Sequence, residues 1–289
     1  MKTRTILGLV LVLGAGFGIR NLPQKVSPGL AAWWPWTTTT VTLYFSDGRS
    51  FVPVSRRMTR NLDLPRATLQ ALLDGPASRT GLQNPVPRGV EVRSFAIREG
   101  VAHIDLSSAF QGDPAGTRAA ETAIVETMTA IAGVWSVSLS IDGRSLVDSA
   151  TRVPLLYYAS ATGLVGVPVS ATTPRAAVAT YLAGPTDRSL TGLPADARLL
   201  DYVHDPADGS LSLNFSYTPS VRTLALEHPE RMRLLLLGLI ASLTEFPSVR
   251  TVRLDFEGQT RLGLGQCSDL LRTPQPRPEL LNDERLLER

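Results

Sequence analysis

The sequence predicts an α+β protein made of two tandem, similar modules, each a small, mainly antiparallel sheet with two helices packed on one face. The first observation behind this prediction is a repeat, in which the segment 64–76 (LPRATLQALLDGP) returns as 173–185 (TPRAAVATYLAGP). Flanking segments return in the same order: 52–55 as 167–170, 100–107 as 209–216, and 133–143 as 248–258. A repeat of roughly 110 residues is the size of a small domain, so it indicates a duplicated module and not a solenoid or propeller.

The second observation is that each copy contains short β-rich runs joined by turn dipeptides. Runs at 41–45 and 51–54 flank Asp47-Gly48 and predict an opening hairpin. A second hairpin is predicted in each copy, with strands at 90–97 and 101–106 and at 197–203 and 211–215. The alternation of apolar and polar residues places His103 and Asp105 together on the sheet face opposite the core.

Two helices are predicted in each copy. The first begins at Pro65 or Pro174, which suits the first helical turn because the missing N–H would have no intrahelical partner there. The second helix and a closing strand follow, at 117–132 and 134–141 in one copy and at 229–246 and 249–256 in the other. Residues 234–240 are apolar almost all round, so we expect this helix to help form the contact between the modules. The order of elements in each copy is β-β-α-β-β-α-β. Its two helices are expected to cover one face of the sheet and to leave the other face to solvent or a partner.

The two ends of the chain are expected to lie outside the modules. Lys2 and Arg4 precede an apolar stretch at 6–19, which has the form of an export signal and is short for a membrane span. Residues 1–20 are therefore predicted to be a signal peptide or membrane anchor, and residues 21–40 a linker. The linker segment Trp33-Trp34-Pro35-Trp36 either lies at a membrane interface or docks on the first module. Residues 263–289 are rich in proline and charge and are predicted to form a flexible C-terminal tail.

Composition places the 289 residues among ordinary globular proteins, with 43% hydrophobic and 19% charged residues. The formal net charge is +3, and basic residues run together only in pairs such as Arg56-Arg57, so no nucleic-acid partner is expected. Cys267 is the single cysteine, which excludes an intrachain disulfide and a thiolate zinc site. It is interpreted as an incidental residue of the tail.

No group of residues stands out as a chemical centre, so no catalytic, cofactor-binding or metal-ligating residue is predicted. His103 and Asp105 share a strand face, but the sequence offers no nucleophile motif for them to serve, and a surface histidine is the simpler interpretation. His204 and His228 have no second histidine at metal-ligand spacing. One turn gathers three carboxylates without the glycine and terminal glutamate of a calcium loop: Asp201, Asp205 and Asp208.

The repeated motifs resemble the GerMN domain family. The resemblance rests on the helix that ends in Leu-Leu-Asp-Gly-Pro at residue 76, on the Val-Ala-His-Ile-Asp-Leu-Ser strand at 101–107, and on the closing strand that ends at Gly143. It covers 41–147 and 153–262, which are the expected boundaries of the two domains. The second copy departs from the pattern, with Asn214 in place of Asp105. The resemblance implies an exported, membrane-tethered protein of the sporulation and germination family, with no known catalytic centre.

These observations lead to the expectation of a non-enzymatic cell-envelope protein at the outer face of the cytoplasmic membrane. Its tandem modules are expected to act in protein–protein interaction or assembly, with an envelope protein or a second copy as partner. The alternative is a module that binds peptidoglycan or another carbohydrate. That alternative would use three aromatic residues, if they are exposed, to stack on sugar rings: Trp135, Tyr157 and Tyr158.

Overall fold

The structure is a computed structural model that describes residues 38–60, 63–257 and 267–287. The predictions for the leader at 1–20 and for the tryptophan-rich segment fall outside the described residues. Of the described residues, 40–56, 63–257 and 267–287 belong to one compact unit, which contains both copies of the repeat. Its secondary structure is α+β, with mostly antiparallel strands and several helices, as predicted.

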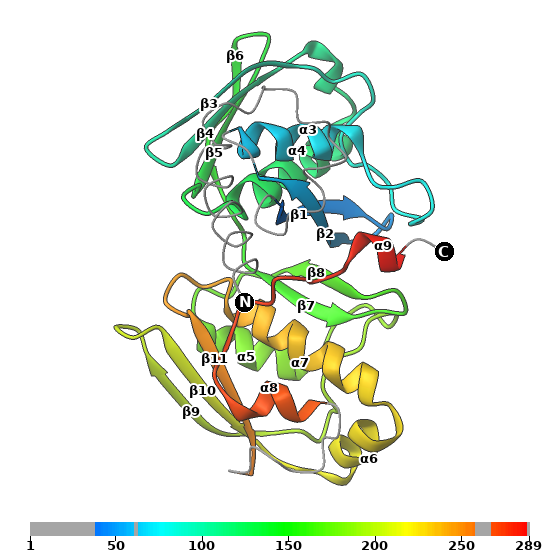
Figure 1. The fold of residues 1–289 in the computed structure, drawn as a ribbon, viewed down its shortest axis with the longest axis vertical. Coiled ribbons are helices and arrows are strands. Elements are labelled where there is room, and N and C mark those ends of the chain that lie inside the picture. Colours follow the sequence, from blue (N-terminus) through cyan, green and yellow to red (C-terminus); the bar gives the residue numbers. More distant parts are fainter. Residues whose placement is uncertain (1–37, 61–62, 258–266, 288–289) are drawn as a thin grey trace, which may run out of the picture. The chain divides into compact units, whose positions relative to one another are not determined.

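The first module is built on a four-stranded sheet in the order β3-β4-β5-β6 (Figure 1). Strands β4 and β5 are parallel, and the outer pairs are antiparallel. The strand bounds are Val92–Arg98, Val101–Leu106, Ser136–Ile141 and Arg144–Thr151. Helices α3 (Leu64–Asp74) and α4 (Pro114–Thr129) pack together, and α4 contacts the sheet. Helix α4 begins earlier than predicted because the Asp113 carboxylate caps it by accepting from the Gly116 N–H at 3.0 Å.

The second module repeats this arrangement with the sheet order β9-β10-β11-β12. Its strands are Leu199–Asp205, Ser210–Phe215, Thr251–Phe256 and Gln275–Pro276. Its helices are α5 (Pro174–Ala183), α6 (Pro219–Glu227) and α7 (Pro229–Leu243). Helix α6 was not predicted; the Thr218 hydroxyl caps it by accepting from the Val221 N–H at 3.3 Å. Within the described ranges, no helix combines the length and apolar character needed to cross a membrane.

Strand alternation follows the predicted faces. Ala102, Ile104 and Leu106 of β4 are buried, as are the equivalent residues of β10. His103 is exposed on the other face, as expected. The hydrophobic core of each module therefore lies between its sheet and its helices.

The opening hairpins do not join the main sheets of their own modules, which the sequence did not indicate. Strands β1, β2, β7 and β8 instead form a third sheet in the order β1-β2-β8-β7, which both modules share (Figure 1). Their bounds are Thr38–Ser46, Phe51–Thr59, Leu155–Ala159 and Leu164–Pro168. Strand β7 is the second copy of β1, and β8 is the second copy of β2, so the order is symmetric about the β2–β8 contact. Phe51 pairs there in antiparallel fashion with Gly166. The two modules therefore meet as the subunits of a two-fold dimer do, with the same surface on both sides.

Residues 267–287 are not the flexible tail that was predicted. They form α8 (Ser268–Arg272), β12 and α9 (Glu284–Leu287), and β12 completes the second sheet beside β11. Leu271 and Leu281 are buried, and so is Cys267, whose Sγ lies 3.5 Å from the Pro229 carbonyl oxygen. Proline and charge indicated a tail, but this segment is ordered by contacts with residues far away in the sequence.

Candidate functional site

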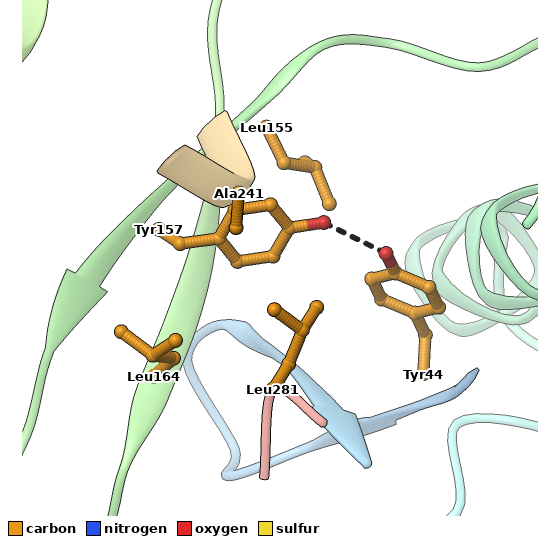
Figure 2. Close-up of a cluster of buried hydrophobic side chains, with 6 residues drawn as sticks. All are labelled: Tyr44, Leu155, Tyr157, Leu164, Ala241 and Leu281. Carbon is orange, nitrogen blue, oxygen red and sulfur yellow. Dashed lines mark hydrogen bonds between the residues drawn. The ribbon is translucent and has the colours of Figure 1, made fainter. Parts of the chain in front are cut away.

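The junction between the modules has an apolar centre made by residues of both copies (Figure 2). Strand β1 supplies Tyr44, strands β7 and β8 supply three residues, helix α7 supplies Ala241 and the C-terminal segment supplies Leu281. The contribution of α7 confirms the expectation that its apolar surface helps join the modules. The hydroxyl groups of Tyr44 and Tyr157 meet at 2.7 Å, and both rings are fully buried. These two tyrosines occupy equivalent positions in the two copies. The contact at the centre of the junction is therefore between two equivalent residues.

A matching hydrogen bond between strand and helix occurs on each side of the junction. The Tyr44 N–H donates to Thr127 Oγ1 at 3.1 Å, and the Tyr157 N–H donates to Ser242 Oγ at 2.8 Å. Each helix thus offers a hydroxyl to the main chain of its neighbouring strand. This contact satisfies a buried N–H that lies at the edge of the shared sheet.

Two arginines complete the symmetric part of the junction. Arg152 follows β6 and lies over the Tyr44 ring at 5.7 Å, while Arg277 follows β12 and lies over the Tyr157 ring at 5.8 Å. Strands β6 and β12 hold equivalent places beside the closing strands, so the arginines are equivalent too. A guanidinium over an aromatic face is attracted by the negative electrostatic potential at the face of the neutral ring, which is a cation–π interaction.

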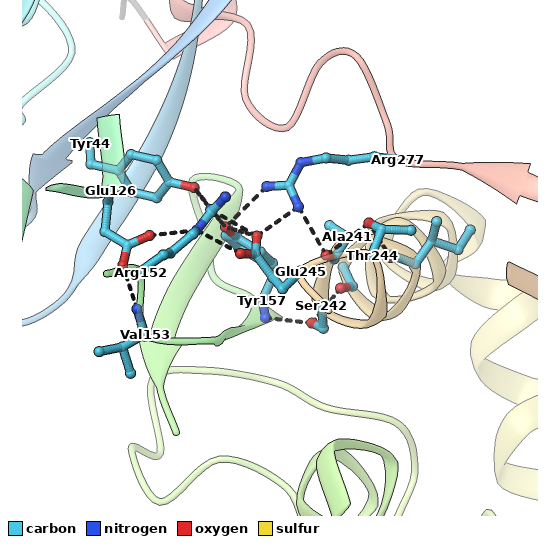
Figure 3. A network of polar contacts seen from close by, with 12 residues as sticks. Tyr44, Glu126, Arg152, Val153, Tyr157, Ala241, Ser242, Thr244, Glu245 and Arg277 are labelled. Carbon is cyan, nitrogen blue, oxygen red and sulfur yellow. Dashed lines mark hydrogen bonds and ion pairs between the residues drawn. The ribbon is translucent and has the colours of Figure 1, made fainter. Parts of the chain in front are cut away.

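The carboxylates of the junction break the symmetry (Figure 3). Glu126 of α4 corresponds to Ala241 in the second copy, and Glu245, just after α7, corresponds to Ala130 in the first. Arg152 Nε lies 2.7 Å from Oε2 of Glu126 and 2.7 Å from Oε2 of Glu245. Arg277 Nη1 lies 2.7 Å from the other oxygen of Glu245. Two arginines and two glutamates therefore form one buried network.

The protonation of Glu126 is set by this environment. Burial is the main cause that raises its pKa to about 7; Arg152 opposes the shift, and the negative charge of Glu245 adds to it. Oε2 of both carboxylates, and Nε of Arg152 between them, lack an aligned hydrogen bond. A single N–H cannot point at two oxygens, so a proton on Glu126 relieves the repulsion between two carboxylates at one guanidinium nitrogen.

The neighbouring phenols act as hydrogen-bond donors. Burial, followed by the charge of Glu245, raises the pKa of Tyr157 well above its ordinary value, so the hydroxyl stays protonated. It donates to Glu245 Oε1 at 2.7 Å. Tyr157 is therefore a neutral hydrogen-bond donor within the network.

A C-terminal asparagine closes the gap between β2 and β8. Pro53 of β2 is next in register after the Phe51–Gly166 pair, opposite Leu164 of β8, but proline has no N–H to donate to that strand. Asn282 Nδ2 donates instead, to the Pro53 carbonyl at 2.6 Å and to the Leu164 carbonyl at 2.8 Å. Its Oδ1 accepts from the Leu164 N–H at 2.8 Å. The side-chain amide thus takes the place of a missing strand pair.

The same segment is anchored by an ion pair. Glu284 binds Arg56 of β2 through both of its oxygens, at 2.5 and 2.6 Å, and accepts from the Ala77 N–H at 3.1 Å. Bidentate arginine–carboxylate pairs fix orientation as well as position. The C-terminal segment is therefore a structural part of the junction.

A surface cavity opens beside the charged network. Its volume is about 320 Å³, and it is bounded by Thr129, Val134, Trp135, Thr151, Arg152, Pro154, Glu245, Phe246 and Pro247. Of the three aromatic residues considered for sugar stacking, Trp135 is 63% exposed, whereas Tyr157 and Tyr158 are buried. Tyr157 and Tyr158 therefore cannot stack on a sugar, and of the three only Trp135 has the exposure that such stacking requires.

The residues first considered for chemistry lie apart from this junction. Asp105 accepts from Ser140 Oγ at 2.7 Å and from the Gly143 N–H at 2.9 Å, and these hydrogen bonds lower its pKa. Its contacts hold a turn in place. His204 Nε2 lies 3.0 Å from the Ser248 carbonyl oxygen, which is a loop contact. Across residues 38–60, 63–257 and 267–287, no three His, Cys, Asp or Glu side chains are grouped so as to hold a metal ion.

Sequence reasoning missed the residues that matter most at the junction. Glu126 lies in an otherwise apolar helix segment, AIVETM, and a carboxylate on a buried helix face is a signal that was available. Arg152, Glu245, Arg277 and Asn282 carry no such local signal. Their importance depends on which distant elements the fold brings together.

The fold and the junction define the class of protein. It is a duplicated α+β module whose two copies are joined through their opening hairpins and the C-terminal segment. A family model described as Germane, sporulation and spore germination, matches residues 42–147 and 155–262. The chain belongs to this family, the GerMN domain family, and carries the domain twice.

The fold is similar to that of a solved structure with two tandem domains. The tandem GerMN domains of the sporulation protein GerM from Bacillus subtilis match with a TM-score of 0.66 at 18% identity, over 85% of this chain and 99% of that one. The first GerMN domain of the same protein matches 46% of this chain and 94% of its own, with a TM-score of 0.34 at 19% identity. A putative lipoprotein from Clostridium perfringens matches 42% of this chain and 85% of its own, with a TM-score of 0.28 at 23% identity. No curated protein matches the chain.

Proposed function

We propose that this chain is a non-enzymatic cell-envelope protein whose two GerMN modules act together as an interaction or assembly unit. Its proposed location is the outer face of the cytoplasmic membrane, reached through the leader expected at 1–20. The observation that supports this proposal best is the junction, where the shared sheet and a buried ionic network join the modules. Modules joined in this way present their outer sheet faces at a fixed spacing. Pre-organised surfaces bind partners with less loss of conformational entropy.

Strand β9 offers one surface for such a partner. It lies at the edge of the second sheet, where no other strand of the described residues pairs with its outer N–H and C=O groups in that sheet. Leu200 and Val203 on this strand are 54% and 56% exposed. An edge strand with exposed apolar side chains is a template on which another chain can add a strand.

Site-specific crosslinking in cells tests the proposal. A photoreactive amino acid in place of Val203 should crosslink the full-length protein to one envelope protein or to a second copy. The same substitution at Leu286, which is 81% exposed on α9, is the matched control and should give far fewer crosslinks. Failure to crosslink at Val203, combined with strictly monomeric sedimentation of the purified protein, would contradict the proposed role.

A further inference from the structure

The exposed indole of Trp135 is held in place from behind. The main-chain N–H of Trp135 donates to the Gly100 carbonyl at 3.0 Å, and the indole ring packs against Gly100. A Cβ at Gly100 would lie 2.0 Å from ring carbons, and the φ of +75° also favours glycine. One face of the ring is thus covered by the turn, while the side chain as a whole remains 63% exposed. The indole is a fixed, flat, apolar platform at the wall of the 320 Å³ cavity.

The second copy uses the equivalent position differently. Arg250 occupies the equivalent position just before strand β11, and its main-chain N–H donates to the Gly209 carbonyl at 2.6 Å. Its guanidinium turns back and donates to the Asp208 carbonyl at 2.6 and 3.1 Å. The turn therefore does not require an aromatic side chain. An exposed indole at this position is therefore a feature of the first copy alone among the two repeats.

The charges of the cavity wall are already compensated. Arg152 contributes to the wall, but its guanidinium lies between Glu126 and Glu245 and also donates to the Tyr44 hydroxyl at 2.5 Å. A charged ligand would have to break these pairs in a partly desolvated site, which is costly. The wall also contains two prolines and two threonines; the Thr129 hydroxyl donates to the Val125 carbonyl at 2.6 Å and can still accept a hydrogen bond. These features select a ligand that is uncharged, polar at its edge and apolar on one face.

We propose that this cavity binds a neutral sugar ring of a polysaccharide, stacked on the free face of Trp135. A pyranose ring presents axial C–H groups on its face and hydroxyl groups at its edge, which match a single aromatic platform beside Thr129 and Thr151. A proline-rich peptide also stacks on aromatic rings, but it is recognised by grooves with several exposed aromatic side chains. Here Phe246, the other aromatic residue of the wall, is only 5% exposed. The proposal is independent of the assembly role.

The test uses the full-length protein and a soluble trimer of β-1,4-linked N-acetylglucosamine as the probe. Calorimetric titration should show binding to the wild type, and Trp135→Ala should weaken it by about tenfold or more, because the platform is lost. Arg250→Ala, the change at the equivalent position of the second copy, should leave binding unchanged. Equal affinity of wild type and Trp135→Ala, or no binding to either, would overturn the proposal.

Two further measurements keep the result interpretable. Trp135→Phe retains a smaller aromatic face and should bind with intermediate affinity, so a folding defect in the alanine variant does not decide the outcome. Decaproline is titrated in parallel. Binding of decaproline without binding of the sugar trimer would also overturn the proposal, because the occupant would then be a peptide.

Discussion

Replacement of Glu126 by glutamine tests the protonation of the buried acid at the junction. Glu126 is 1% exposed and shares Arg152 with a second carboxylate. Glutamine has nearly the same shape and is neutral at every pH, as the protonated acid is. The difference in unfolding free energy between wild type and Glu126→Gln therefore reports the proton equilibrium of this side chain, while the other titrating groups largely cancel.

The magnitude follows from the pKa. It is raised from 4.5 to about 7 in the folded protein, chiefly by burial. The acid is thus protonated in the folded chain and ionised in the unfolded chain between pH 4.5 and 7. Folding binds a proton in this window, so the contribution of Glu126 to stability is full below pH 4.5 and is lost as the pH rises towards 7. A shift of this size corresponds to about 3 kcal/mol.

Urea unfolding at a series of pH values between 4.5 and 8 measures the effect. The wild type should lose about 3 kcal/mol relative to Glu126→Gln across this range, with no further change above pH 7 to 8. Glu121→Gln makes the same change of residue type on the same helix outside the network and serves as the control variant. Parallel stability curves for wild type and Glu126→Gln would refute the reasoning, since they would place the titration of Glu126 in its ordinary range.

Three further outcomes follow from the structure. Asn282→Ala should lower the unfolding free energy by about 3 kcal/mol in urea titrations, because it leaves buried main-chain groups of β2 and β8 unpaired; an effect below about 1 kcal/mol would mean that water replaces the amide. Gly100→Ala should destabilise the protein more than Gly89→Ala in thermal unfolding. Both glycines have positive φ, but only the added Cβ at Gly100 meets the Trp135 ring, so equal melting temperatures would contradict the close contact. Cys267 should react with a thiol reagent at pH 8 only after unfolding, because burial raises its pKa to about 11; rapid reaction of the native protein would place the thiol at the surface.

Local features of the chain were sufficient to predict the modules. Strand alternation predicted the buried face of β4, and prolines predicted the starts of the helices at Pro65 and Pro174, because these signals act within a few residues. The repeat predicted that the second copy would follow the first. Even the departure at Asn214 left the strand intact, since only the solvent-facing residue of the pair changed.

The junction could not be predicted in the same way. The repeat shows that β1 and β7 are similar strands, but similarity does not reveal that their hairpins leave the parent sheets and pair with each other. The composition of residues 263–289 indicated a tail, whereas Arg277 and Asn282 are fixed by partners more than a hundred residues away. Such contacts depend on the folded arrangement of both modules, which no local pattern records.

The symmetry of the junction also bears on why its charged residues differ between the copies. In a dimer of identical subunits every substitution appears twice, so a carboxylate added near the axis brings its own copy with it. A duplicated chain is free of this constraint: the second copy has Ala241 at the position equivalent to Glu126, and the first copy has Ala130 at the position equivalent to Glu245. Both acids can then gather at Arg152, and one side of the junction can carry an exposed indole while the other carries an arginine. The surface beside Trp135 therefore differs from the equivalent surface beside Arg250, so a ligand of the proposed cavity would distinguish the two copies.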